Sequence, residues 1–121
     1  PNFGFEIVDV RDTASLHRIA MESSTAIGKR LVASTGFIWF KTIAEIIDRS
    51  YPEKKIPTGM MPNFVTVVLS SFIPELRQII MDLGTEKRIS KEESLALGWA
   101  PRKLEDTIKD AAKSLIGLGL A

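Results

Sequence analysis

The chain of 121 residues contains no cysteine, one histidine and one tyrosine. The absence of cysteine excludes disulfides, zinc sites with thiolate ligands and cysteine nucleophiles. A single histidine, His17, cannot form a histidine-rich metal site, and no Ser-His-Asp triad is expected around it. We expect His17 to be exposed or to cap a helix. We therefore predict no metal site and no catalytic residue in this chain.

Long hydrophobic runs and an excess of one charge are also missing. No apolar run approaches the roughly 20 residues that a membrane-spanning helix needs, and no signal peptide is evident, so we expect a cytoplasmic protein. Lys and Arg number 16 against 15 Asp and Glu, and both halves of the chain are balanced, so neither nucleic acid nor membrane is expected as a partner. The first residue is Pro1 rather than Met, and we expect it to mark a cut in a longer protein.

Hydrophobic periodicity predicts an α/β chain that is mostly helical, with about three short strands. The strands are expected at residues 5–10, 30–34 and 86–89, where β-branched and aromatic side chains gather. Helices are expected over residues 12–22 and 40–47, from Pro62 through Ser71, from Pro74 to Gly84, after Ser90 as far as Gly98, and over residues 104–116. The order of strand and helix at the front of the chain favours α/β over a pure helical bundle.

Several of these helices carry specific local signals. Asp12 is a candidate N-cap for the first helix, and Ser90 with Glu93 fits the S-x-x-E capping box. Inward-facing positions in the last helix are predicted to be Leu104, Ile108, Ala111, Ala112 and Leu115. Apolar residues also follow Pro62 at helical spacing, and these are Phe64, Val67 and Val68, with Ser71 next.

Tyr51 and Lys55 form a Tyr-x-x-x-Lys motif, the pair that acts as a general acid/base in short-chain dehydrogenases. That chemistry needs both residues on one face of a continuous helix. Pro52 directly follows Tyr51, so we predict a loop at a helix end instead. Gly117 and Gly119 lie at the end of a helix rather than between a strand and a helix, so they do not form a dinucleotide fingerprint.

Two apolar features leave two interpretations open. Trp39 and Trp99 each follow a glycine turn, and either core packing or the wall of a ligand pocket is consistent with that position. Met60 and Met61 form an adaptable apolar corner, for which core packing is expected and a pocket wall is the alternative.

Several segments, taken in order, resemble extended short-chain dehydrogenases/reductases of the NAD-dependent epimerase/dehydratase superfamily. Residues 5–14 are similar to the family's strand-to-helix segment Val-Asp-Val-Arg-Asp-x-Ala, and residues 28–34 followed by 40–47 are similar to its next strand and helix. Residues 51–57 resemble a linker of the dihydroflavonol-4-reductase-like branch, and residues 97–102 followed by 104–116 resemble its C-terminal end. Lys103 departs from the pattern, which has a hydroxyl residue at that position.

The resemblance implies that residues 1–121 form a single substrate-binding domain, the C-terminal portion of such an enzyme. Members of the family reduce a carbonyl or oxidise an alcohol by hydride transfer with NADP(H) or NAD(H). Their N-terminal Rossmann domain carries the glycine fingerprint and the catalytic residues, so this chain is expected to bind no cofactor and to pack residues 1–22 against that domain. Residues near the first strand approach substrate in the family, which makes Asn2, Phe3 and Phe5 candidates for the wall of a pocket for a small carbonyl or alcohol.

A second hypothesis belongs to a different class. Under this second hypothesis, the chain is a self-contained, non-catalytic interaction domain that assembles through its apolar helix faces. Under the first hypothesis a homo-oligomer is also expected, because a missing Rossmann domain leaves the apolar face of the first helix uncovered. We expect that assembly to bury Leu16, Ile19 or their neighbours.

We expect the purified 121-residue chain to leave NADPH unoxidised with any aldehyde or ketone, because the chain lacks the glycine fingerprint and the helical Tyr-x-x-x-Lys pair. The loss of NADPH absorbance in the presence of a panel of carbonyl compounds measures this. Robust turnover by the isolated chain would contradict the hypothesis that the chemistry lies in another domain.

Overall fold

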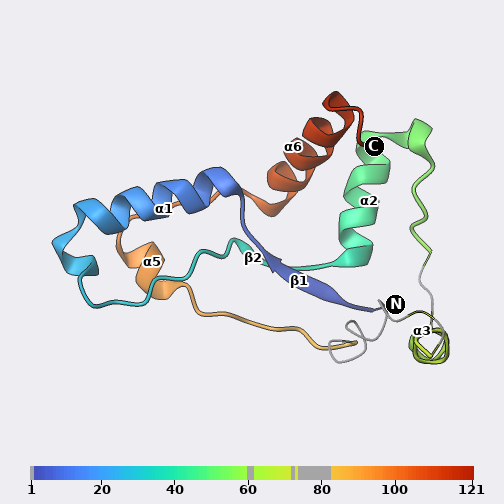
Figure 1. Ribbon diagram of the computed structural model, residues 1–121, viewed down its shortest axis with the longest axis horizontal. Helices are drawn as coiled ribbons and strands as arrows, with labels where there is room; N and C mark the ends of the chain where they lie inside the picture. Colours follow the sequence, from blue (N-terminus) through green and yellow to red (C-terminus); the bar gives the residue numbers. More distant parts are fainter. Residues whose placement is uncertain (1, 60–61, 72, 74–82) are drawn as a thin grey trace. The chain divides into compact units, whose positions relative to one another are not determined.

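The computed structural model describes residues 2–59, 62–71, 73 and 83–121. In chain order the elements are β1 (Gly4–Ile7), α1 (Val10–Glu22), the 3₁₀ turn η1 (Ser24–Ala26), β2 (Gly36–Trp39), α2 (Phe40–Ser50), the 3₁₀ turn η2 (Pro52–Lys54), α3 (Asn63–Leu69), α5 (Glu92–Ala96) and α6 (Leu104–Gly117) (Figure 1). The predicted helix after Pro74 falls almost entirely on residues 74–82, which lie outside the described residues. The chain is mostly helical, as the periodicity predicted.

The chain divides into two compact units. Unit 1 comprises Pro1–Phe5 and Phe37–Lys87 and contains α2 and α3; unit 2 comprises Glu6–Gly36 and Arg88–Ala121 and contains α1, α5 and α6. The boundary between the units falls within each of the two strands. In the ranges that the structure describes, every helix is too short or too polar to cross a membrane.

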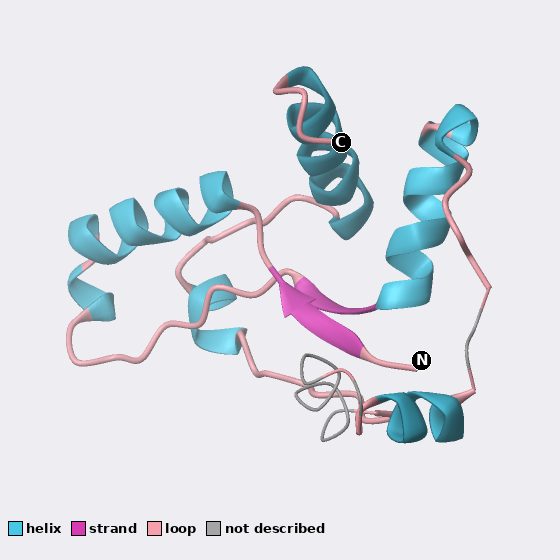
Figure 2. Cartoon of the chain, turned by 45° about the vertical axis from the view of Figure 1, so that its right-hand side comes forward, coloured by secondary structure: helices cyan, strands magenta, loops and turns pink. Residues whose placement is uncertain are grey.

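The strands β1 and β2 form a two-stranded sheet (Figure 2). At one end the N–H of Thr35 donates to the carbonyl oxygen of Ile7 (2.8 Å), and at the other the N–H of Phe40 donates to that of Phe3 (2.9 Å). Residue numbers therefore rise along β2 as they fall along β1, so the pair is antiparallel. A Cβ atom at Gly4 would lie 2.5 Å from the carbonyl oxygen of Ile38, which explains why this position carries glycine.

The strand predictions are only partly confirmed. β1 ends at Ile7 rather than at residue 10, because α1 begins at Val10. Residues 30–34 and 86–89 are not strands, and the second strand is Gly36–Trp39, which starts at the predicted turn glycine. The backbone of the 30–34 loop bonds to a side chain instead of a strand: Ser94 Oγ accepts from the N–H of Val32 (3.0 Å) and donates to its carbonyl oxygen (2.8 Å).

The predicted N-cap of α1 is wrong by three residues. Asp9 is the cap, and its carboxylate accepts the backbone N–H of Arg11 at 2.8 Å. Asp12 lies inside the helix and is buried, and its carboxylate accepts the backbone N–H of Arg102 (2.8 Å) and pairs with the Arg102 guanidinium. The carbonyl oxygen of Asp12 accepts the indole N–H of Trp99 (2.8 Å). Asp12 therefore anchors the segment before α6 to α1.

The capping box before α5 is also wrong. The N-cap of α5 is Lys91, which makes no capping hydrogen bond with its side chain, and Glu93 forms an ion pair with Lys29 at 2.8 Å. The helix ends, as predicted, just before Gly98, which adopts a left-handed conformation (φ +85°).

The predicted helices at residues 40–47 and 104–116 are confirmed as α2 and α6. α2 extends the predicted range by three residues, to Ser50, with Tyr51 as its C-cap before Pro52, and α6 extends its predicted range by one residue. In α6, Ile108 is buried as predicted, whereas Ala111 and Leu115 are exposed. Periodicity located these helices correctly and assigned part of the buried face of α6 incorrectly.

Replacing Ser94 with alanine is expected to lower the free energy of unfolding by about 1–3 kcal/mol, because the partly buried N–H and carbonyl of Val32 lose their partner. Urea unfolding followed by circular dichroism measures the change. Ser90→Ala removes an equivalent hydroxyl from an exposed position and is the matched control. Equal stability losses in the two variants would contradict the role given to Ser94.

Candidate functional site

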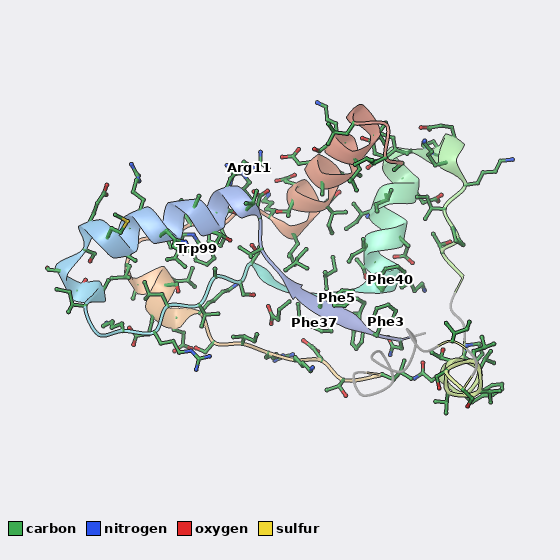
Figure 3. The ribbon with its side chains drawn as sticks, viewed as in Figure 1. Phe3, Phe5, Arg11, Phe37, Phe40 and Trp99 are labelled. Atoms are coloured by element: carbon green, nitrogen blue, oxygen red, sulfur yellow. The ribbon has the colours of Figure 1, made fainter. Side chains whose placement is uncertain are left out.

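Three phenylalanine rings of unit 1 form a continuous aromatic surface, the aromatic wall, made of Phe3, Phe5 and Phe40 (Figure 3). Phe3 is buried; its ring stacks on Phe40 with centroids 4.9 Å apart and planes inclined by 17°, and it meets Phe5 edge-on at 5.3 Å and 88°. Phe5 and Phe40 each remain 47% exposed. A buried ring thus holds two half-exposed rings, which gives a rigid apolar surface.

Backbone hydrogen bonds hold this wall in place. The N–H of Phe40 donates to the carbonyl oxygen of Phe3, which ties the start of α2 to the N-terminal segment. One residue earlier, Asn2 donates its N–H to the side-chain oxygen of Asn63 (3.0 Å) and accepts the N–H of Gly84 at its carbonyl (2.6 Å). Hydrogen bonds at both its N–H and its carbonyl therefore hold the backbone of Asn2 beside the wall.

The structure brings two of the three predicted pocket residues into ring contact, Phe3 and Phe5, and places Asn2 next to them in the chain. Sequence reasoning missed Phe40, which is as exposed as Phe5. Phe40 was predicted only as the first residue of a helix, and nothing local indicates that its ring stacks on Phe3, next to the first strand.

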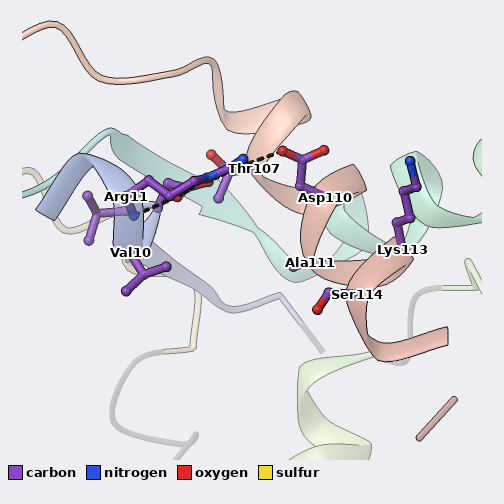
Figure 4. Close-up of a pocket in the computed structure, with 9 residues that line it drawn as sticks. Val10, Arg11, Thr107, Asp110, Ala111, Lys113 and Ser114 are labelled. Carbon is purple, nitrogen blue, oxygen red and sulfur yellow. Dashed lines mark hydrogen bonds and ion pairs between the residues drawn. The ribbon is translucent and has the colours of Figure 1, made fainter. Parts of the chain in front are cut away.

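A cleft of about 670 Å³ opens in unit 2 beside the first turn of α1 and one side of α6 (Figure 4). Its walls are formed by Val8, Asp9, Val10 and Arg11 together with Thr107, Asp110, Ala111, Lys113 and Ser114. The wall therefore combines apolar patches with charged and hydroxyl groups.

The charges at this cleft are largely paired with one another. The Arg11 guanidinium donates to both carboxylate oxygens of Asp9 (2.9 and 2.6 Å) and to Asp110 on α6 (2.5 Å). Hydrogen bonds from the Arg11 side chain hold the pKa of Asp9 well below its ordinary value of 3.8, although burial opposes this effect. The same two carboxylates raise the pKa of Arg11. The cluster joins α1 to α6 and does not present a free acid or base.

The predicted lack of a helical Tyr-x-x-x-Lys pair is confirmed by the backbone. Tyr51 ends α2, residues Pro52–Lys54 form η2, and Lys55 adopts a left-handed conformation (φ +48°), so Tyr51 and Lys55 do not share a helix face. Within the described ranges, no three His, Asp or Glu side chains gather in an arrangement that could hold a metal ion.

The two tryptophans differ in burial and in the contacts they make. Trp99 is buried and bonded to Asp12, which confirms core packing, whereas Trp39 is partly exposed and packs edge-on against Phe37 (4.8 Å). Met60 and Met61 lie outside the described residues.

No protein-family model matches the chain. In sequence it is 26% identical over 118 residues to an uncharacterised oxidoreductase of Saccharomyces cerevisiae, and 28% identical over 111 residues to the NADPH-dependent methylglyoxal reductase Gre2 of the same yeast. These matches cover 96% and 90% of this chain but 30% and 28% of the two relatives. The chain therefore spans about three tenths of the length of the curated relatives it matches.

The fold is similar to that of the crystal structure of the yeast methylglyoxal/isovaleraldehyde reductase Gre2 complexed with NADPH, with a TM-score of 0.71 and 23% identity. The match covers 98% of this chain and 35% of that chain. The chain has the fold of one part of that reductase. This confirms the predicted fold class, a mostly helical portion of a larger reductase fold.

The β1–α1 turn does not fit the pyrophosphate of a dinucleotide. Such a group is held by free backbone N–H groups at a helix N-terminus, after a glycine-rich turn. In this chain the Asp9 carboxylate already accepts the N–H of Arg11 there, and residues 5–27 contain no glycine. A second anion at this turn would be repelled by Asp9.

Acid stability tests the Asp9–Arg11 cluster. Because the pKa of Asp9 is depressed in the folded chain, its stabilising contribution is complete above the ordinary value of 3.8 and is lost as the pH falls below it. Asp9→Asn is therefore expected to destabilise the chain near neutral pH, with the difference from the wild type narrowing below about pH 4. Chemical denaturation across this pH range measures the difference, and Asp48→Asn on α2 serves as the control. A difference that stays constant down to strongly acidic pH would contradict the assignment.

Proposed function

We propose that the chain is the substrate-binding part of an NAD(P)-dependent reductase that reduces a carbonyl, or oxidises an alcohol, by hydride transfer. The observation that carries this proposal is the match of nearly the whole chain, in sequence and in fold, to about a third of Gre2. The poor fit of the β1–α1 turn to a dinucleotide supports a cofactor site elsewhere in the intact enzyme. In this proposal the chain shapes the pocket and a nucleotide-binding domain supplies NADPH or NADH and the catalytic groups. The enzyme is expected to act in the cytoplasm.

The aromatic wall is the proposed contact for substrate. Phe5 and Phe40 offer two half-exposed rings on a buried support, which suits the apolar body of a small carbonyl or alcohol. Asn2, whose backbone is held on both sides, completes the proposed wall. The linker at residues 51–57 and the segment at 97–102 favour a dihydroflavonol-reductase-like member of the family.

Residues 1–22 are proposed to pack against the nucleotide-binding domain. The exposed face of α1 supports this, because Val10, Ala14, His17 and Met21 follow one another at helical spacing and all are exposed. This is not the face expected from the sequence: Leu16 is buried inside unit 2, since α1 turns that side toward the core.

A chimera tests the proposed function. The chain replaces the matching part of Gre2, so that the Gre2 nucleotide-binding region supplies the cofactor site. We expect the chimera to oxidise NADPH with at least one aldehyde or ketone of a panel that includes methylglyoxal and isovaleraldehyde. Phe5→Ala and Phe40→Ala are each expected to raise KM several-fold with a smaller change in kcat, because they remove apolar contact that substrate and transition state share.

Phe64→Ala is the matched control, because it removes an exposed phenylalanine from α3 and leaves the aromatic wall intact. A folded chimera that binds NADPH but reduces no carbonyl of the panel would contradict the proposed function. Equal KM changes for Phe5, Phe40 and Phe64 would contradict the placement of substrate at the wall.

A further inference from the structure

The residue between the two N-terminal rings of the aromatic wall has no side chain. Gly4 lies between Phe3 and Phe5, whose rings contact each other and therefore lie on one side of the backbone. Successive side chains of an extended chain point to opposite sides, so a side chain at position 4 would point to the other side. Gly4 thus leaves a space behind the wall.

The ring of Phe37, on β2, occupies the space behind Gly4. A Cβ atom at position 4 would lie 2.5 Å from Cζ and 2.9 Å from Cε1 of Phe37, and 2.5 Å from the carbonyl oxygen of Ile38. Carbon atoms in favourable contact are roughly 3.5–4.0 Å apart. Any side chain at position 4 would therefore displace both the Phe37 ring and the backbone of β2.

A displaced β2 would alter the wall, because α2 follows β2 directly. Trp39 is the last residue of β2 and Phe40 is the first residue of α2. The N–H of Phe40 donates to the carbonyl oxygen of Phe3 at 2.9 Å, and the two rings stack with centroids 4.9 Å apart. Moving β2 away from Gly4 would lengthen this hydrogen bond and separate the stacked rings.

We propose that Gly4 and Phe37 are positioning residues for the substrate. The bare backbone of Gly4 lets β2 approach closely enough for Phe40 to stack on Phe3, and the Phe37 ring supports the same backbone from behind the wall. Both act through the rings of the wall and neither touches the substrate. All of these residues belong to unit 1. This inference rests on the proposed function, because it takes the aromatic wall as the contact for substrate.

Kinetics of the chimera with Gre2 test the positioning role. Gly4→Ala is expected to raise KM for the carbonyl substrate to about the level of Phe40→Ala, with a smaller change in kcat and an unchanged affinity for NADPH. In the Phe40→Ala background, Gly4→Ala is expected to add little, because both changes act on the same ring contact. Gly59→Ala is the matched control and is expected to leave KM unchanged, because a Cβ atom there meets nothing within 4 Å. Additive increases in KM for Gly4→Ala and Phe40→Ala would overturn the inference.

NMR spectroscopy of the 121-residue chain with isotope-labelled phenylalanine rings separates this inference from the proposed function. The nuclear Overhauser contact between the rings of Phe3 and Phe40 is expected in the wild type and in Gly59→Ala, and it is expected to weaken in Gly4→Ala. Phe37→Leu removes ring atoms and adds none, so it keeps the test open if Gly4→Ala does not fold, and it is expected to weaken the same contact.

The two measurements together distinguish the outcomes. An unchanged contact between the rings of Phe3 and Phe40 in the folded variants would overturn the inference, whatever the chimera does. A weakened contact together with a folded chimera that reduces no carbonyl would support the positioning role and contradict the proposed function.

Discussion

The buried carboxylate of Asp12 fixes the arrangement of unit 2. Asp12 bonds to Trp99 and Arg102, which lie 87 and 90 residues further along the chain. A buried carboxylate is tolerated only when it is paired, so the strand-to-helix segment and the segment before α6 are held at one distance from each other. Because α6 starts at Leu104, two residues after Arg102, the same contact also sets the wall of the cleft and the place where Asp110 meets Arg11.

The helices were predicted more accurately than the strands, for one physical reason. A helix of three turns repeats its pattern several times within one local window, so α2 and α6 were found within a few residues of their true ends. The loop at residues 30–34 has the composition of a strand, but its backbone bonds to the distant Ser94 rather than to a neighbouring strand. Asp12 was predicted to cap α1, but the cap is Asp9, and Asp12 bonds to Arg102, a residue 90 positions away that no local pattern indicates.

In the candidate site, too, contacts between residues distant in the sequence could not be predicted from local patterns. Phe3 and Phe5 were proposed through a resemblance that places residues near the first strand beside substrate, while Phe40 was missed because its ring partner lies 37 residues away in the sequence. For α3, spacing identified which residues share a face. Spacing contains no information about whether that face is covered by the same chain, by another chain or by water.

One consequence of the fold concerns how its two halves can be observed. The chain has two tryptophans, and each compact unit contains one: Trp39 lies in unit 1 and Trp99 in unit 2. Trp99 is enclosed and its indole N–H is bonded, whereas Trp39 is partly open to solvent, so the two indoles occupy environments of different polarity. Each unit thus carries its own intrinsic fluorophore, and the loss of structure in either one has a separate optical signature.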